Sequence, residues 1–93
     1  MTARKFINVW DALEGDASEA ANLKLRSTLM MKIAEYVEEN GLTQSQAAIN
    51  LGTTQPRLND VLRGRIDKCT VDRLVNMLTQ VGYRVDLQIF QAA

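Results

Sequence analysis

The 93-residue sequence predicts an all-α protein, a compact bundle of about five helices followed by one C-terminal β-strand. Apolar residues recur at helical spacing in four segments between residues 16 and 82, and a short helical turn over residues 9–13 makes the fifth. Residues that start or end helices border these segments. After residue 82 the pattern changes to alternating apolar and polar residues, which is typical of a half-buried strand.

The composition favours a single small domain and argues against several classes of protein. Apolar residues make up 46% of the chain, which is ordinary for a globular protein. The sequence has no histidine and one cysteine, so it lacks the parts for a structural zinc site, Cys-His or Ser-His-Asp catalysis and an internal disulfide. We therefore expect no enzyme, cofactor or metal. No apolar run approaches the ~18 residues of a membrane span and no signal peptide is apparent, which favours the cytoplasm.

Charge is balanced over the whole chain but is unevenly distributed. The formal net charge is zero. Residues 1–52 hold five Lys or Arg against seven Asp or Glu, whereas residues 53–93 hold six against four. Within residues 54–68 two aspartates are outnumbered by four basic residues, Arg57, Arg63, Arg65 and Lys68. This weak basic footprint favours specific nucleic-acid binding over general attraction to polyanions.

The chain divides into an N-terminal arm over residues 1–15, a helical domain over residues 16–82, and a C-terminal dimerisation strand and tail over residues 83–93. The arm contains an apolar cluster around Trp10, the only tryptophan. Trp10 either packs the arm onto the domain or anchors a partner protein. We favour packing, because a tryptophan ring buries a large apolar area.

The first long helix is expected from Asp16 to about Asn40. Asp16 opens a stretch that resembles a capping box, and Gly41 suits the left-handed residue just past a helix end. One apolar stripe follows the positions i, i+4, i+8, i+11 and i+12: Leu25, Leu29, Ile33, Tyr36 and Val37. Lys24 and Arg26 lie mostly off this stripe, and we interpret them as a solvated face in preference to phosphate contacts.

Residues 42–64 contain two short helical patterns separated by a tight turn. Thr43-Gln44-Ser45-Gln46 is a full capping box at the start of the first helix. Gly52 allows the positive φ that the sharp turn needs. Thr54 caps the second helix, whose buried side has i, i+3, i+4 spacing: Leu58, Val61 and Leu62. This arrangement is that of a helix-turn-helix.

The second helix of this motif carries side chains that can form hydrogen bonds with the edges of DNA bases. A helix fits the major groove, where Gln and Asn bond bidentately to adenine, Arg to guanine and Asp to cytosine. The predicted base-reading residues are Gln55, Arg57, Asn59 and Asp60. Asp60 has the alternative role of holding Arg57 or Arg63 in place.

The N-terminus of the first helix offers unpaired N–H groups and a positive dipole end to a phosphate. The predicted phosphate-contacting residues are Thr43, Gln44, Thr54, Arg63, Arg65 and Lys68. Pure capping is the alternative for Thr43, and solvated charge is the alternative for the three basic residues.

A connecting loop over residues 65–69 leads to the last helix. Cys69 is expected to fill the edge of the core and not to act as a reactive thiol. Thr70 caps the helix and Gly82 ends it. Its apolar face consists of Val71, Leu74, Val75, Leu78 and Val81.

The tail has the alternating pattern of a strand but no strong partner within the chain. A lone strand cannot satisfy its own backbone, and the only other candidate is a weak one over residues 5–9. We expect antiparallel pairing with the same strand of a second subunit, which makes a homodimer. The alternative is pairing with the arm or packing on the helices. The predicted dimerisation residues are Tyr83, Val85, Leu87 and Ile89.

Within residues 43–64 lie Thr43-Gln44, Ala47-Ala48 and Leu51-Gly52-Thr53-Thr54-Gln55-Pro56-Arg57-Leu58. These residues resemble the XRE/Cro–phage-repressor family of helix-turn-helix proteins, whose fold is that of the lambda repressor. The resemblance implies a dimeric, all-helical repressor of a palindromic operator. It places these residues at DNA-contacting positions: Gln44, Gln55, Arg57, Asn59 and Asp60. Thr53 and Asn50 stand where the family usually has apolar residues, which predicts a less closely packed turn and a more exposed edge.

The arm Asn8–Glu14 and the C-terminal strand are similar to those of small HigA-type antitoxins, which are often encoded beside a RelE/HigB-like toxin. We interpret the chain as a sequence-specific, dimeric repressor whose partner is double-stranded DNA. The alternative is an antitoxin that neutralises such a toxin protein and represses its own operon. A small basic RelE-like gene beside this one would favour the alternative.

Overall fold

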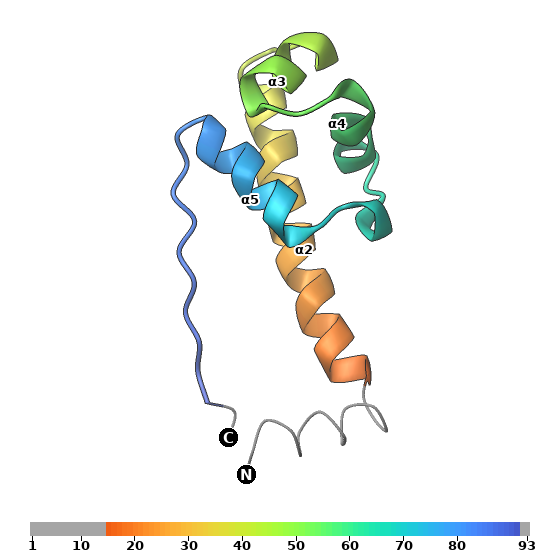
Figure 1. Ribbon diagram of the computed structural model, residues 1–93, viewed down its shortest axis with the longest axis vertical. Coiled ribbons are helices and arrows are strands. Elements are labelled where there is room, and N and C mark those ends of the chain that lie inside the picture. Colours follow the sequence, from red (N-terminus) through yellow and green to blue (C-terminus); the bar gives the residue numbers. More distant parts are fainter. Residues whose placement is uncertain (1–14, 92–93) are drawn as a thin grey trace.

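The computed structural model describes residues 15–91, which form an all-helical domain (Figure 1). Four α-helices and one short 3-10 helix follow in the order α2 (Gly15–Glu39), α3 (Gln44–Leu51), α4 (Gln55–Leu62), η2 (Ile66–Lys68) and α5 (Val71–Gln80). The all-α class is therefore confirmed. The fifth helical segment expected over residues 9–13, together with Trp10 and the rest of the arm, lies outside the described residues.

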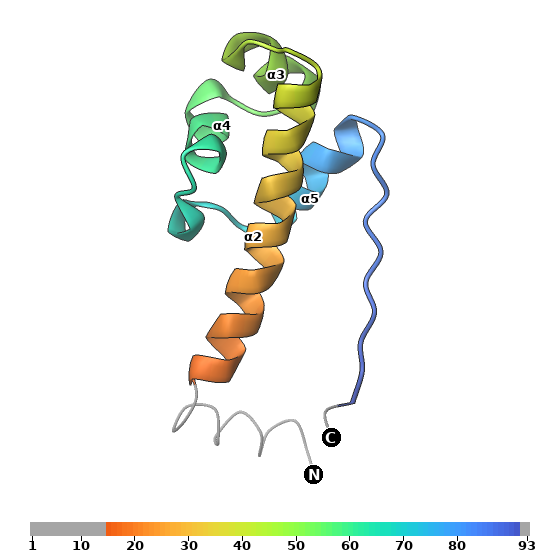
Figure 2. The ribbon, with the colours of Figure 1, turned by 180° about the vertical axis from the view of Figure 1, so that it is seen from behind.

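The long helix α2 supports the other elements. In both ribbon views α3, α4 and α5 gather around the C-terminal half of α2, while its N-terminal half extends away from them (Figures 1 and 2). The centre of the core holds five large side chains that are almost inaccessible to solvent: Ile33, Leu51, Leu58, Leu74 and Leu78. They come from all four α-helices, so each helix is fixed by burial of its own apolar side. No helix in residues 15–91 is long and apolar enough to cross a membrane.

The expected helix caps are confirmed at three threonines and wrong at Asp16. The Oγ1 atoms of Thr43, Thr54 and Thr70 each accept a hydrogen bond from the backbone N–H three residues later, at 3.1, 3.3 and 3.3 Å. Asp16 is not an N-cap because Gly15 before it is already helical. An N-cap residue has non-helical dihedral angles, and the polar pattern at Asp16 does not by itself reveal whether the preceding chain is helical.

The expected C-terminal strand is absent from the described chain. Residues 83–91 follow α5 as an extended segment that runs back toward the N-terminal end of α2, and no strand is assigned in residues 15–91 (Figure 1). A strand is defined by backbone hydrogen bonds to a neighbour, and the described part of one chain supplies none. Tyr83 is tied to the domain, since its ring lies edge-on to the Tyr36 ring at 6.4 Å between centroids and Nζ of Lys32 lies 5.5 Å from the Tyr83 centroid.

Arg26 has a structural role that the sequence pattern did not predict. Its guanidinium Nη1 donates to the carbonyl oxygens of Ile66, at 2.7 Å, and Cys69, at 3.4 Å. Ile66 is the first residue of η2, and its carbonyl also accepts from the N–H of Cys69 at 3.2 Å; Cys69 is the residue that follows η2. Arg26 therefore ties the loop between α4 and α5 to α2, and its interpretation as part of a solvated face is wrong. Lys24 is exposed, as expected.

Replacement of Arg26 should destabilise the fold, whereas replacement of Lys24 should not. Arg26→Met keeps much of the aliphatic bulk but removes the guanidinium donor from both carbonyls, and the Ile66 carbonyl then keeps only the Cys69 N–H. We therefore expect a loss of ~1–3 kcal/mol in the free energy of unfolding. Lys24→Met is the matched control and should change it by less than ~0.5 kcal/mol. Urea unfolding followed by circular dichroism measures both. Equal stabilities of the two variants would contradict the structural role of Arg26.

Candidate nucleic-acid interface

The helix-turn-helix is built from α3, a three-residue turn and α4. At the start of α3 the Thr43 hydroxyl accepts from the Gln46 N–H, and Oε1 of Gln46 accepts from the Thr43 N–H at 3.0 Å, which completes the capping box. Gly52 ends α3 in the left-handed region at φ 66°. A Cβ at this position would lie 3.0 Å from Nε2 of Gln80 on α5. Glycine is therefore favoured here for its dihedral angle and for the close approach of α5.

The α4 helix has one buried side and one polar side. Leu58 is fully buried and Val61 is 5% exposed, whereas Leu62 is only partly buried against the core. Gln55 lies at the first position of the helix and is exposed, and Asn59 one turn later is half-buried. Pro56 occupies the first turn, where a missing N–H costs little. The structure thus presents Gln55 and Asn59 to an approaching ligand on a helix whose orientation is fixed by its inner side.

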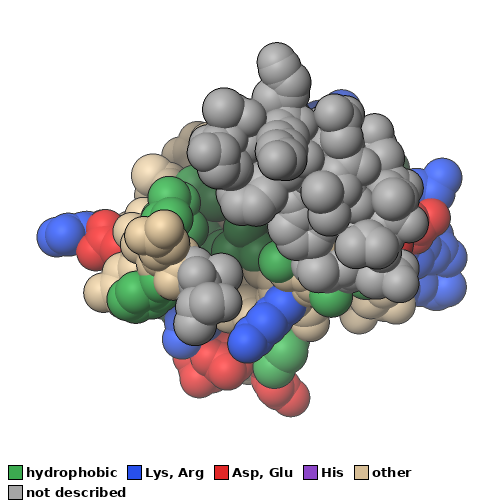
Figure 3. All heavy atoms as spheres, turned by 90° about the horizontal axis from the view of Figure 1, so that it is seen from below, with side chains coloured by type: hydrophobic (Ala, Val, Ile, Leu, Met, Phe, Trp, Pro, Cys, Tyr) green, Lys and Arg blue, Asp and Glu red, His purple; other side chains and the backbone are tan. Residues whose placement is uncertain are grey.

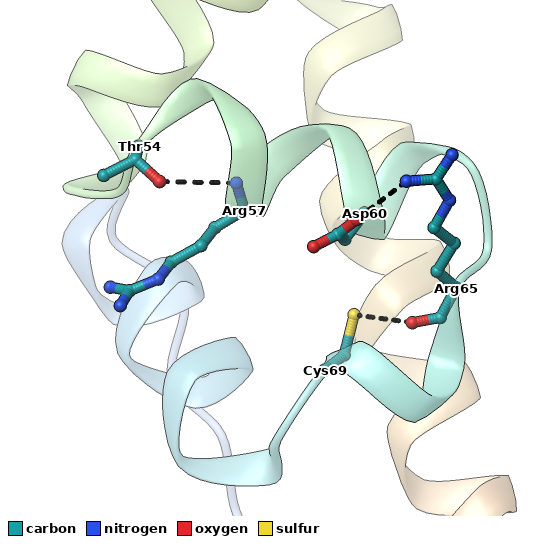
Figure 4. Close-up of polar contacts among 5 residues, drawn as sticks. All are labelled: Thr54, Arg57, Asp60, Arg65 and Cys69. Carbon is teal, nitrogen blue, oxygen red and sulfur yellow. Dashed lines mark hydrogen bonds and ion pairs between the residues drawn. The ribbon is translucent and has the colours of Figure 1, made fainter.

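Arg57 lies on the flank of α4 that faces α5. Its N–H donates to the Thr54 hydroxyl, and its exposed side chain extends toward α5 (Figure 4). There it lines a cleft of about 540 Å³ between the turn of the motif and α5. Arg57 therefore has a different neighbourhood from Gln55 and Asn59, with which it was grouped from the sequence.

Asp60 is paired with Arg65, and not with Arg57 or Arg63 as the sequence suggested. Oδ1 of Asp60 accepts from Nη1 of Arg65 at 3.2 Å, and the Asp60 side chain is 24% exposed (Figure 4). The pair joins the last turn of α4 to the residues just before η2. Asp60 could still accept a hydrogen bond through its second oxygen, but its charge is partly compensated within the protein.

Cys69 fills the edge of the core, as expected. The side chain is 5% exposed and its thiol donates to the Arg65 carbonyl at 3.4 Å (Figure 4). Burial raises the pKa of the Cys69 thiol above its ordinary value, because a thiolate is poorly solvated there, and the Asp60 carboxylate adds to this effect. A thiol held in its neutral form is a poor nucleophile, which agrees with a packing role.

The predicted phosphate-contacting residues lie along the edges of the motif. Thr43 and Thr54 are exposed N-caps whose hydroxyl oxygens are engaged in the caps, and Gln44 is the exposed first residue of α3. Arg63 is the exposed C-cap of α4, and Lys68 is exposed at the end of η2. Asn50, which was expected at an exposed edge, is exposed and donates to the Tyr36 hydroxyl at 3.3 Å.

Arg73 is a candidate residue that sequence reasoning missed. It lies in the first turn of α5, where its N–H donates to the Thr70 hydroxyl at 3.3 Å. Its side chain lines the same cleft as Arg57, although the two residues are sixteen positions apart. A surface arginine on the last helix carries no sequence signal, because only the packing of α5 against α2 and α3 brings it beside α4.

A family model described as a helix-turn-helix domain matches residues 13–90, which is most of the chain. The chain therefore belongs to this helix-turn-helix domain family. The family and the fold indicate a DNA-binding regulatory protein. No curated protein matches the chain.

The cap of α4 should depend on the hydroxyl of Thr54. In Thr54→Ala the N–H of Arg57 loses its acceptor, and the free energy of unfolding should fall by ~0.5–2 kcal/mol. Thr54→Ser keeps the oxygen and is the control, with stability close to that of the natural protein. Thermal unfolding followed by circular dichroism compares the two variants. An alanine variant as stable as the serine variant would show that the cap contributes little.

Proposed function

We propose that the protein is a cytoplasmic, sequence-specific transcriptional repressor that binds a palindromic DNA operator as a homodimer. The observation that carries the proposal is the arrangement of α4, with one side buried in the core and polar side chains on the other. This eight-residue helix is capped at Thr54, anchored by Leu58 and Val61, and presents Gln55 and Asn59 on its accessible side. The N-terminal part of such a helix enters the major groove in helix-turn-helix complexes. Resemblance of the motif to the XRE/Cro–phage-repressor family supports the repressor role.

Base readout is assigned first to Gln55 and Asn59. Each amide can donate to adenine N7 and accept from its N6 amino group, which is worth ~1–3 kcal/mol of discrimination per base. Asp60 is a further candidate through its second carboxylate oxygen, which could accept from cytosine. Arg57 was predicted to read guanine, but its side chain lies on the flank of α4 that faces α5.

Phosphate contacts on the two sides of α4 would fix the protein on the duplex. The N-terminus of α3, with Thr43 and Gln44, offers backbone N–H groups to one strand. The residues after α4 offer Arg63, Arg65 and Lys68 to the other strand. Residues 54–73 hold five basic side chains against three acidic ones, so the positive charge of this neutral chain is concentrated around the motif. Such contacts position the helix without selecting a sequence.

Dimerisation is assigned to the C-terminal segment. Leu87 and Ile89 are 71% and 85% exposed, although they are large apolar side chains, and Val85 on the same face is 39% exposed. Seen from below, hydrophobic side chains are visible on the surface at the end of the molecule where this segment finishes (Figure 3). Antiparallel pairing of residues 83–89 from two chains would cover this face and satisfy the backbone. In such a dimer the two copies of α4 would bind two half-sites of the operator, whose centres are about 34 Å apart.

Asn59→Ala should lose sequence-specific affinity while keeping general affinity for DNA. The preferred site is first selected from random duplexes with the natural protein, and affinities for it and for a scrambled duplex are then measured by fluorescence anisotropy. We expect a loss of about fivefold or more on the selected duplex only, from the bidentate contact. Asn50→Ala, on the α3 side facing Tyr36, is the matched control and should bind normally. An unchanged ratio of the two affinities in Asn59→Ala would refute the readout assignment.

Two aspartates on the apolar face of the tail should prevent dimerisation. The double variant Leu87→Asp, Ile89→Asp places charges on the face that pairs, whereas Gln88→Asp places one charge on the opposite face. Sedimentation velocity should therefore give monomers for the double variant and dimers for the control. Tyr83, which packs on the domain, is unchanged in both variants. A double variant that remains dimeric would exclude this segment as the interface.

The second candidate function is an antitoxin that binds a RelE/HigB-like toxin and represses its own operon. It is favoured by Phe90, which is 79% exposed next to Ile89 and breaks the alternation, so that both faces of the tail end are apolar. A protein partner could cover this surface. The similarity of residues 8–14 to antitoxin arms also supports it. A neighbouring gene for a small basic ribonuclease, whose toxicity is relieved by co-expression of this chain, would establish this function.

A further inference from the structure

The cleft between the motif and α5 is lined by groups that suit an anion. Its walls are the turn at Gly52 and Thr53 and the flank of α4 at Arg57. On the α5 side it is lined by Arg73, Asn76 and Gln80, the last residue of that helix. Among residues 15–91, no acidic residue lines the cleft. A smaller recess of about 20 Å³ beside it is lined again by Arg57 and Arg73, together with Lys68 of η2. Three cations from three different elements therefore converge on one region.

These three cations lack the carboxylate partner that some other basic residues have. Lys32, Arg65 and Arg84 each lie within 3.2 Å of a carboxylate oxygen. In residues 15–91 no ion pair involves Arg57, Lys68 or Arg73. Like charges that share a region repel one another, so an anion placed among them gains attraction from all three.

The fold holds both arginines at fixed places along the cleft. Each is the third residue of its helix, and each N–H donates to the N-cap threonine at 3.3 Å, Arg57 to Thr54 and Arg73 to Thr70. The end of α5 lies directly against the turn, because Gln80 would touch any side chain at Gly52. Both arginines are therefore positioned by the capped first turn of a helix.

We propose that Arg57 and Arg73 bind a phosphate group of the DNA backbone in this cleft, beside the groove that α4 enters. This inference rests on the proposed function. Two guanidinium groups suit the oxygens of a phosphodiester, and the cleft opens next to the first turn of α4, where the strand bordering the major groove must pass. Asn76 and Gln80 add neutral donors. Arg57 thereby contributes affinity without selecting a base, and α5 becomes part of the interface.

The charge of Arg73 should determine general affinity and its dependence on salt. Arg73→Gln should weaken binding to the selected and scrambled duplexes by the same factor. The slope of log affinity against log salt should become shallower by about one for each subunit bound, because each subunit loses one phosphate contact. Arg57→Gln should do the same, and Arg73→Lys should restore the slope. Lys24→Gln, which removes an exposed cation of α2 outside the motif, is the control and should leave the slope unchanged. Thermal unfolding confirms that each variant is folded.

The outcomes of these experiments separate a failure of the phosphate assignment from a failure of the proposed function. If the natural protein binds DNA and Arg73→Gln leaves the slope unchanged, the phosphate assignment is wrong and the proposed function stands. If Arg57→Gln changes the preferred base instead of lowering all affinities equally, Arg57 is a base reader and the assignment of this residue is overturned. If the natural protein binds neither duplex, the proposed function fails, and the DNA backbone as the source of the phosphate fails with it.

Inorganic phosphate tests the cleft independently of DNA. Titration of the natural protein, followed by NMR of the arginine side chains, should shift the Nε–H signals of Arg57 and Arg73 together. Arg73→Gln should abolish the shift at Arg57, whereas Lys24→Gln should not. Shifts at these residues without DNA binding would identify a free phosphorylated molecule as the ligand, in place of the DNA backbone. Absence of any shift at saturating phosphate, together with an unchanged salt slope in Arg73→Gln, would exclude the site.

Discussion

Burial of the inner side of α4 is the constraint on which the rest of the structure depends. An eight-residue helix is too short to be stable alone, because helix nucleation is costly and only a few hydrogen bonds follow it. Its stability comes from Leu58 and Val61, which are buried among side chains of the other helices, and from the Thr54 cap. Once these residues are buried, the rotation of α4 about its own axis is determined. The exposed side chain of Gln55 and the half-buried side chain of Asn59 are thereby placed on the polar side of the helix.

The same packing explains how a chain with no net charge can present a basic surface. Ion pairs neutralise some cations, as Asp60 does for Arg65. Arg26 is withdrawn into the structure, where its guanidinium binds the carbonyls that follow α4. Arg57, Lys68 and Arg73 remain around the cleft beside the motif. The distribution of charge among pairs, internal hydrogen bonds and an unpaired cluster therefore matters more for nucleic-acid binding than the total.

The C-terminal segment has the sequence pattern of a strand, but the described chain offers it no neighbouring strand. The alternation from Tyr83 to Ile89 is regular, yet the described chain forms no strand there. Tyr83 is held by Tyr36 and Lys32, and the apolar side chains beyond it are exposed. An extended segment with apolar side chains exposed is suited to pairing with another strand, and this is the basis on which we propose that two copies of it form the dimer. Pairing of two motifs would also compensate for the limited charge of one.

The sequence by itself determined the helices, the caps at Thr43, Thr54 and Thr70, the left-handed Gly52 and the buried side of α4. These features depend on neighbours within one or two turns, which periodicity and capping chemistry reveal. Asp16 was misassigned because a cap also depends on whether the preceding residues are helical. Only the tertiary structure decided the partner of Asp60, the internal role of Arg26 and the approach of Arg73 to Arg57. Those relations join residues of different elements, and they follow from how α4, η2 and α5 pack around α2, which no local pattern records.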